Sequence, residues 1–200
     1  MTILRDRNTD RAAFRHNAEL IGDLLIIEAI NRGFIPSVRK PVVSPTGVSV
    51  TGISVSTASV VAVSIVRAGN ALVNSVFRIL DPNMELGQLV IQRDESTALP
   101  VTLLDKLPQG IGEAACVVVL DPMLATGGSV LAAIDVLLTK GVRAERVVLL
   151  HALGCPEGIA AITDRFPEIR AIIGVVDSHL NERKFIIPGL GDFGDRFFCP

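Results

Sequence analysis

The chain of 200 residues contains no tryptophan and no tyrosine, so phenylalanine is the only large aromatic side chain that could stack on nucleic-acid bases. Its 19 basic and 21 acidic residues give a net charge of −2, which argues against a general nucleic-acid-binding protein. No apolar run approaches the roughly 20 residues needed to cross a bilayer. The charged start MTILRDRNTDRAAF lacks the apolar stretch of a signal peptide. We therefore expect a cytoplasmic protein with neither nucleic-acid nor membrane partners.

Cysteine is scarce as well. Cys116, Cys155 and Cys199 are odd in number and lie far apart, which favours three reduced thiols over a disulfide framework. The three histidines do not cluster with them, so a structural zinc site is not expected.

The residues that are present suit a compact α/β protein. Hydrophobic residues make up 49% of the chain and charged residues 20%. A large core is therefore possible, and disorder is not expected. We expect residues 1–200 to form a single domain, because the length suits one compact unit and no interdomain linker is visible.

The first clear element is a helix over Thr9–Asn31, in which apolar residues recur three or four positions apart. Thr9 is the expected N-cap and Gly33 the expected stop. Four arginines lie before this helix or in its first two turns, which indicates a solvated basic face, although they could instead meet an anionic ligand or a partner subunit. They are Arg5, Arg7, Arg11 and Arg15.

Strand signals dominate the rest of the chain. Short β-like runs broken by proline and glycine over Val38–Val55 predict a hairpin or flap. Further apolar runs predict strands at Val60–Val66, Gln88–Gln92, Ala115–Leu120, Arg146–Leu150 and Arg170–Val176. Helices are expected over Gly128–Thr139 and Pro156–Asp164. Apolar strands joined by helices predict a mainly parallel sheet that is covered on both faces.

The segment Val117–Leu138 joins a buried strand to a helix through the turn LDPMLATGGS. Ligands of open α/β sheets bind beyond the carboxyl ends of the strands, where Asp121 is expected. Gly127 and Gly128 let backbone N–H groups approach an anion at the helix N-terminus, and neighbouring hydroxyl groups can donate to it. A Walker A loop would require a lysine directly after the glycines, and this turn has none. We predict a cradle for a terminal phosphate beside an acceptor for sugar hydroxyls, which together suit a 5-phosphorylated ribose.

A second glycine-rich stretch, IPGLGDFGD at residues 187–195, fits the G-x-G-x-x-G spacing of a dinucleotide-binding turn. Dinucleotide binding also needs a preceding strand, a helix opening at the third glycine and a later acidic residue. Pro188 precedes the glycines, and residues 195–200 are too few, we expect, to build a helix or a second strand. We therefore reject dinucleotide binding for this stretch.

The turn LDPMLATGGS resembles the phosphoribosyl pyrophosphate loop of type I phosphoribosyltransferases, in the form typical of the uracil branch, where a single Asp is followed by Pro. Other segments are similar in the same order: VSIVRAG (63–69), IQRDEST (91–97), CPEGIAAI (155–162) and FIIPGLGDFGDRFF (185–198). The resemblance implies the type I phosphoribosyltransferase fold. This is an α/β fold with a central, mainly parallel sheet flanked by helices and a small β flap or hood.

The resemblance also implies the residues of the site. Arg67, Arg93 and Asp192 would be catalytic, with the arginines stabilising a pyrophosphate leaving group and Asp192 contacting the donor or its hydrated metal. They would bind phosphoribosyl pyrophosphate together with Asp121, Pro122, Met123, Leu124, Ala125, Thr126, Gly127, Gly128 and Ser129. Uracil would be held, mainly by the main chain, at Ile186, Gly191, Asp192 and Phe193, with the Phe193 ring as an apolar wall. Mg²⁺ would be the cofactor, held by donor oxygens and water rather than by direct protein ligands.

The implied activity is uracil salvage, in which uracil and phosphoribosyl pyrophosphate give UMP and pyrophosphate in a homodimer or higher homo-oligomer. Two alternatives stay open, because Asn70-Ala71-Leu72 departs from the family pattern after Arg-Ala-Gly and Phe185 replaces a usual tyrosine. One is a related phosphoribosyltransferase that acts on a different nucleobase. The other is a non-catalytic nucleotide-binding regulator with the same fold.

Overall fold

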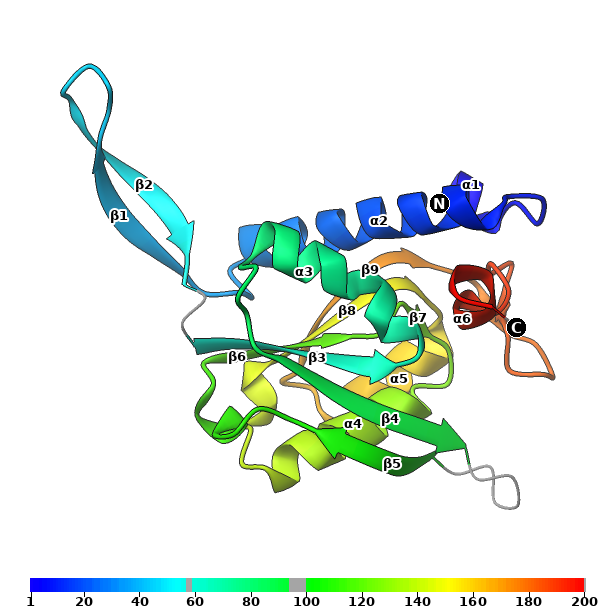
Figure 1. Cartoon of the computed structure of the whole chain (residues 1–200). Coiled ribbons are helices and arrows are strands. Elements are labelled where there is room, and N and C mark those ends of the chain that lie inside the picture. The colour runs from blue at the N-terminus through cyan, green and yellow to red at the C-terminus, as the bar shows by residue number, and fades with distance from the viewer. Residues whose placement is uncertain (57–58, 94–99, 200) are drawn as a thin grey trace.

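A seven-stranded sheet forms the centre of the structure, a computed structural model that describes residues 1–56, 59–93 and 100–199 (Figure 1). The strand order is β5-β4-β3-β6-β8-β7, and β9 also pairs with β8. The strands are β3 (Val60–Val66), β4 (Leu86–Arg93), β5 (Pro100–Lys106), β6 (Cys116–Leu120), β7 (Met123–Leu124), β8 (Val147–Gly154) and β9 (Arg170–Val176). Every pairing is parallel except that of β4 with β5. The mainly parallel sheet expected from the sequence is confirmed.

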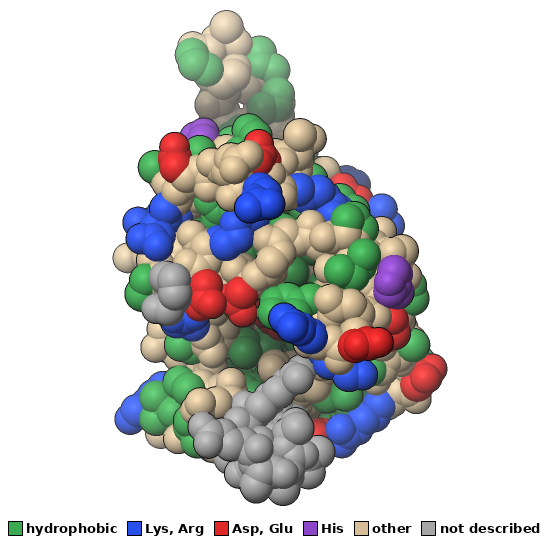
Figure 2. Space-filling view, turned by 90° about the vertical axis from the view of Figure 1, so that its right-hand side faces the viewer, with side chains coloured by type: hydrophobic (Ala, Val, Ile, Leu, Met, Phe, Trp, Pro, Cys, Tyr) green, Lys and Arg blue, Asp and Glu red, His purple; other side chains and the backbone are tan. Residues whose placement is uncertain are grey.

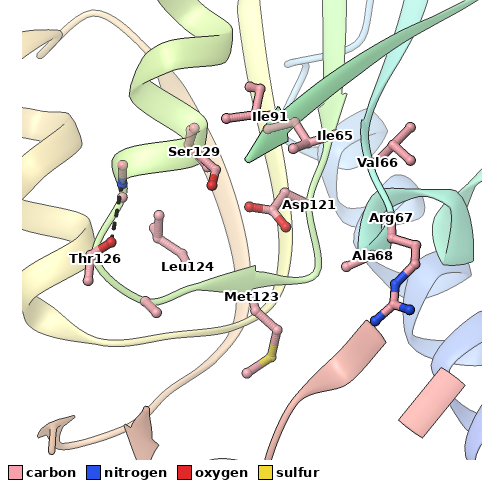
Figure 3. A pocket seen from close by; sticks show the side chains of 14 residues that line it. Ile65, Val66, Arg67, Ala68, Ile91, Asp121, Met123, Leu124, Thr126 and Ser129 are labelled. Atoms are coloured by element: carbon pink, nitrogen blue, oxygen red, sulfur yellow. Dashed lines mark hydrogen bonds between the residues drawn. The ribbon is translucent and has the colours of Figure 1, made fainter. Parts of the chain in front are cut away.

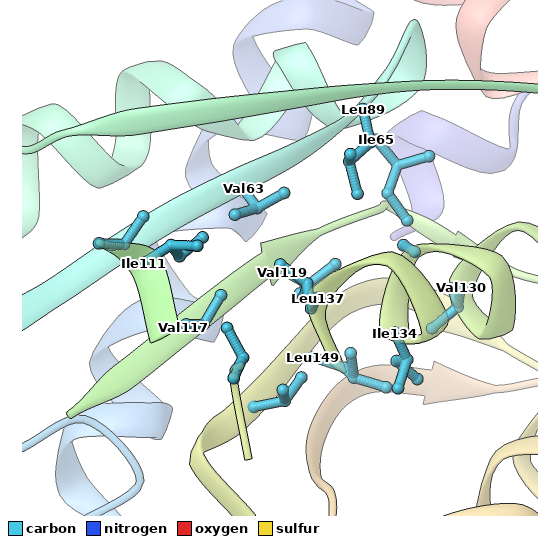
Figure 4. Packing of buried hydrophobic residues seen from close by; sticks show 14 of the residues in the cluster. Val63, Ile65, Leu89, Ile111, Val117, Val119, Val130, Ile134, Leu137 and Leu149 are labelled. Atoms are coloured by element: carbon cyan, nitrogen blue, oxygen red, sulfur yellow. The ribbon is translucent and has the colours of Figure 1, made fainter. Parts of the chain in front are cut away.

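Helices cover both faces of this sheet (Figure 1). The pair α2 (Arg11–Asn31) and α3 (Val73–Ile79) buries its apolar residues in one cluster, and the pair α4 (Gly128–Thr139) and α5 (Pro156–Arg165) does so in another. Figure 4 shows the second cluster, in which side chains of α4 lie against those of β3, β6 and β8. All five residues of β6 are buried, which explains its apolar run without polar alternation.

The expected hairpin is present as a two-stranded antiparallel arm that projects from the body, made of β1 (Ser37–Val43) and β2 (Ser49–Val55). The two ends of the chain lie close together at the opposite end of α2 (Figure 1). There, α1 (Thr2–Arg5), the short strands β10 (His179–Leu180) and β11 (Ile186–Ile187), and α6 (Phe193–Phe197) contribute to a third apolar cluster.

Three details differ from the sequence expectations. Asp10, not Thr9, caps α2, because its carboxylate accepts from the Ala13 N–H at 2.8 Å while the Thr9 hydroxyl donates to the Ile3 carbonyl. The sequence patterns do not predict the strand β5 and the helix α3, nor the shorter elements α1, β7, β10 and β11. The C-terminal stretch does form a short helix, α6, because the Asp192 carboxylate caps it by accepting from the N–H of Asp195 at 2.9 Å.

The N-terminal arginines do not form a uniformly solvated face. Arg5 forms an ion pair with Asp177, and the Nε of Arg15 donates to the Phe197 carbonyl at 2.7 Å. Both contacts therefore bind the start of the chain to its C-terminal segment. No helix among the described residues has the length and apolarity needed to cross a membrane.

Candidate active site

A pocket of about 190 Å³ lies beyond the carboxyl ends of β3, β4 and β6 (Figure 3). It is lined by Ile65, Val66, Arg67, Ala68, Ile91, Asp121, Met123, Leu124, Ala125, Thr126, Gly127, Gly128, Ser129 and Val130. The strand ends are where ligands of parallel α/β sheets bind. The structure thus gathers Arg67 and most of the predicted phosphate turn around one cavity.

The turn after β6 is anchored to the neighbouring strand β8. The Pro122 carbonyl accepts from the N–H groups of Ala152 and Leu153, both at 3.0 Å, and β7 pairs with the end of β8. Pro122 is buried and does not line the pocket, so its place is structural support. The Cys155 thiol donates to the Ala125 carbonyl at 3.1 Å.

The glycines of the turn allow the backbone to enter helix α4. Gly127, the N-cap, has φ of +79°, a left-handed conformation that glycine adopts without strain. The Thr126 hydroxyl accepts from the Gly128 N–H at 3.4 Å (Figure 3, dashed). The first N–H groups of a helix have no acceptor within the helix and carry partial positive charge, so α4 offers the pocket an anion-binding end.

Asp121 lies at the base of the pocket and is only 8% exposed. Burial raises the pKa of its carboxyl group to about 7, and a hydrogen bond from the Met123 N–H opposes that shift. A carboxyl with this pKa is poised between its charged and neutral forms at neutral pH. A bound sugar hydroxyl or a cation would favour the charged, accepting form.

His151 is a site-supporting residue that the sequence analysis did not single out. Its Nδ1 lies 2.5 Å from the main-chain carbonyl of Asp121, and its Nε2 has no hydrogen-bond partner within the described part of the chain. Burial lowers the pKa of His151 to about 4, so the ring is neutral at pH 7. Because a carbonyl only accepts, Nδ1 carries the proton and donates. The only signal in the sequence was a polar residue inside the apolar run VVLLHALG.

Arg67 connects the pocket to the C-terminal segment. It follows β3, and its guanidinium donates to the Asp195 carboxylate at 2.5 Å and to the Cys199 carbonyl at 3.1 Å. Nearby Gly69 is needed for close packing, since an added Cβ would lie 2.2 Å from the Leu120 carbonyl oxygen. In Figure 3 Arg67 lies at the pocket edge that faces away from the phosphate turn.

The predicted uracil-binding loop, residues 186–193 (the base loop), ends beside Arg67. Gly189 and Gly191 have φ of +62° and +83°, and the Ile187–Pro188 peptide is cis. Ile186 is buried, whereas Gly191 and Asp192 are exposed. The ring of Phe193 is buried against Phe14 and Phe197 rather than forming an open apolar wall. The main chain is therefore the part of this loop that can face a base.

Arg93 ends β4, but its side chain, like residues 94–97 of the IQRDEST segment, lies outside the described residues. Its role therefore stays a prediction from the resemblance.

The described residues contain no group of three or more His, Cys, Asp or Glu side chains that could hold a metal ion. Among the described residues that line the pocket, Asp121 is the single carboxylate. Mg²⁺ keeps several waters and binds through one or two carboxylates together with substrate phosphates. The residues present therefore fit an ion that arrives largely coordinated by its substrate.

Solved structures of other proteins share this fold. A hypoxanthine phosphoribosyltransferase from Staphylococcus aureus superposes with a TM-score of 0.51 at 11% identity, over 88% of this chain and 85% of that one, which shows a shared fold. The chain therefore has the type I phosphoribosyltransferase fold. The AQ2163 protein from Aquifex aeolicus is closer, with a TM-score of 0.85 and 33% identity over 99% of this chain and 91% of that one.

Sequence relatives give the particular family. Residues 1–199 match the family described as uracil phosphoribosyltransferase. A uracil phosphoribosyltransferase from Dictyostelium discoideum is 43% identical, over 98% of this chain and 89% of that protein. One from Saccharomyces cerevisiae is 41% identical, over 99% of this chain and 89% of that protein. The chain belongs to the uracil phosphoribosyltransferase family.

Proposed function

We propose that this protein transfers the phosphoribosyl group of phosphoribosyl pyrophosphate to uracil, giving UMP and pyrophosphate. The observation that carries the proposal is the placement of Arg67. It lines the pocket of the phosphate turn and also pairs with Asp195, three residues after Asp192 of the base loop. A sugar phosphate in the turn and a flat base at the loop would thus meet at one rim. Relatives that bear this name at about 40% identity support the same reaction.

In this reaction a bond forms between a ring nitrogen of uracil and the anomeric carbon of the ribose. The bond from that carbon to the pyrophosphate oxygen breaks, and the ring nitrogen loses its proton. As the bond breaks, the ribose gains oxocarbenium character, as in glycoside hydrolysis. The N–H groups at the start of α4 and the hydroxyls of Thr126 and Ser129 would hold the 5-phosphate, and Asp121 the ribose hydroxyls.

The leaving pyrophosphate gathers negative charge, which preorganised cations stabilise. Arg67, whose side chain is about half exposed, can turn part of its five-donor fork toward that charge. Arg93 is assigned the same role from the resemblance. Mg²⁺, when bound with the donor, would supply further positive charge at the pyrophosphate oxygens.

Uracil presents alternating carbonyl acceptors and N–H donors around a planar edge. Main-chain N–H and carbonyl groups at Gly191, Asp192 and Phe193 can match such an edge, because glycine lets the ligand approach closely. Ile186, buried below, and the capped helix α6 fix the conformation of this loop.

A pyrophosphate-release assay with phosphoribosyl pyrophosphate and each of uracil, cytosine, adenine, guanine, hypoxanthine and orotate tests the proposal. We expect release with uracil and little with the others. Release with another base and none with uracil would identify the related transferase. Donor binding by calorimetry without release for any base would identify the non-catalytic regulator.

The altered tripeptide Asn70-Ala71-Leu72, one of the two departures that keep the alternatives open, does not line the pocket. The Asn70 side-chain oxygen accepts from the Ser64 hydroxyl at 2.8 Å, and Ala71 and Leu72 are buried in the core. This arrangement favours a change in packing at the tripeptide over a change in base specificity.

We further propose a cytoplasmic homodimer or larger homo-oligomer. The arm β1–β2 carries exposed apolar side chains, among them Val43 at 72% and Ile53 at 78%. A two-stranded hairpin alone is marginally stable in water, so apolar cover from a second copy would stabilise it. Leu24 on α2 is likewise 65% exposed.

A further inference from the structure

The base loop is held at Gly189 by a carboxylate from the neighbouring strand. Asp177 directly follows β9 and is 7% exposed. Its Oδ2 accepts from the Gly189 N–H at 2.8 Å. An added Cβ on Gly189 would lie 2.1 Å from the Ile186 carbonyl oxygen, so only glycine fits at this position of the loop.

Arg5 completes the contact from the other end of the chain. Its guanidinium makes a bidentate pair with Asp177, with N–O distances of 2.8 and 2.6 Å. The nitrogen that donates to Asp177 Oδ2 also donates to the Gly189 carbonyl at 3.0 Å. Both main-chain polar groups of Gly189 are thus occupied by one ion pair.

The ion pair is largely removed from water. The Asp177 side chain is 6% exposed and that of Arg5 is 25% exposed. The hydrogen bond from Arg5 is the main cause that lowers the pKa of Asp177, so the pair stays charged at neutral pH. A buried pair holds its geometry more firmly than an exposed one, and removing one partner leaves an uncompensated charge.

A second arginine ties the same two segments together. Arg196, in α6, donates to the main-chain carbonyls of Leu4, of Asp6 at 2.7 Å and of Leu190 at 2.8 Å. Its guanidinium also lies over the Phe14 ring, 4.4 Å from the centroid. Figure 2 looks onto this end of the molecule and shows basic and acidic side chains lying close together. The N-terminal segment is therefore packed and hydrogen-bonded against the base loop.

We propose that Arg5 and Asp177 are positioning residues for the nucleobase, which hold the main chain of Gly189 so that the following loop residues can bind the base. The inference rests on the proposed function, because it takes the loop at residues 186–193 as the base site. Neither side chain needs to touch the substrate. Their effect should therefore fall on the base and leave the phosphoribosyl donor unaffected.

The test compares Arg5→Lys and Asp177→Asn with the unaltered protein. Lysine keeps the charge but cannot span two carboxylate oxygens and a carbonyl. We expect the KM for uracil to rise about tenfold, as for the loss of a hydrogen bond to a charged group, with the KM for the donor changed by less than about twofold. The double variant should resemble the worse single variant, since residues acting as one unit are not additive.

Asp135→Asn is the matched control. It removes another bidentate pair, with Arg165 at 3.0 and 2.7 Å, which is exposed and joins α4 to α5. Both KM values should stay unchanged in this variant. General damage to the fold would instead raise both KM values together, and this result, or an unchanged KM for uracil in Arg5→Lys, would overturn the proposal.

If the protein does not use uracil, the same variants still test the positioning role of Arg5 and Asp177. If the unaltered protein used another base, the same comparison would be made with the KM for that base. If it turned over no base, calorimetry with UMP would replace kinetics. Equal UMP affinity in the unaltered protein and Arg5→Lys would then overturn the inference, and a loss of about tenfold would support it.

Discussion

Asp121 shows how a single buried side chain makes the stability of the fold depend on pH. Its folded pKa of about 7 lies above its ordinary value of 3.8, so the folded chain keeps a proton that the unfolded chain releases. The folded form is therefore favoured below pH 4, and that advantage is lost as pH rises to about 7.

Asp121→Asn removes this dependence. At pH 8 we expect the variant to have a free energy of unfolding higher than the unaltered protein by on the order of 4 kcal/mol, and about the same value at pH 4. Urea unfolding at the two pH values measures the difference. Donor affinity should fall, because the amide cannot become the charged acceptor. A stability difference that is equal at both pH values would contradict the burial argument.

In the proposed reaction, Arg67 would stabilise the negative charge of the departing pyrophosphate. Arg67→Lys keeps one positive charge but loses the fork that can serve Asp195 and a phosphate together. We expect kcat to fall by about 100-fold, as when one preorganised donor is removed from a transition state. Arg78→Lys is the control, since Arg78 is similarly exposed and pairs with Asp23 at 2.8 Å away from the pocket. Equal losses in both variants would contradict a specific role for Arg67.

At the scale of elements, the phosphate turn depends on how closely α5 packs beneath it. Gly158 lies in the first turn of α5, and an added Cβ would lie 2.4 Å from the Ala125 carbonyl oxygen and 2.8 Å from that of Leu124. Both neighbours are backbone atoms, so either the helix or the turn must shift.

Gly158→Ala should therefore lower the free energy of unfolding by about 1–3 kcal/mol and weaken donor binding measured by calorimetry. Gly52→Ala is a matched change in the arm, where the nearest atom to the added Cβ is 3.6 Å away. It should leave donor affinity unaltered. If Gly158→Ala also left donor affinity unaltered, the turn would not need the support of α5.

The elements themselves differ in how far the sequence predicts them. The strands Val60–Val66 and Arg170–Val176 and the helix Gly128–Thr139 have the predicted boundaries, because strong apolar patterns and glycine mark their ends. The helix α3, with the sequence VNSVFRI, has no such signal. It forms because Val76 is buried and the Ser75 hydroxyl donates to the Glu19 carbonyl of α2 at 3.0 Å, so tertiary packing overrides weak propensity.

The sequence predicts the local parts of the candidate site but not its long-range contacts. The phosphate turn is local in the sequence, and the structure lines a pocket with it. The contacts of His151 with Asp121, and of Arg5 with Asp177, join residues 30 and 172 positions apart. No local pattern carries such information, so Arg5 was interpreted as part of a solvated face.

At the scale of the whole molecule, the projecting arm β1–β2 exposes apolar side chains that no other part of the described chain covers. Ile53→Lys places a charge at its most exposed apolar position. If a second copy covers the arm, sedimentation velocity should show a shift toward the monomer. Ala160→Lys, on the exposed surface of α5, adds the same charge elsewhere and should not change the sedimentation coefficient. An unaltered coefficient in both variants would exclude the arm from the interface.

The contact between Arg5 and Asp177 also sets an order of events during synthesis. A ribosome adds about 5–20 residues per second, so the 172 positions between the two side chains correspond to roughly 10–30 s of translation. A nascent chain can complete its phosphate turn well before its loop for the base can close. If this loop binds the base as proposed, the base site is therefore completed last, when the C-terminal segment meets an arginine made at the beginning.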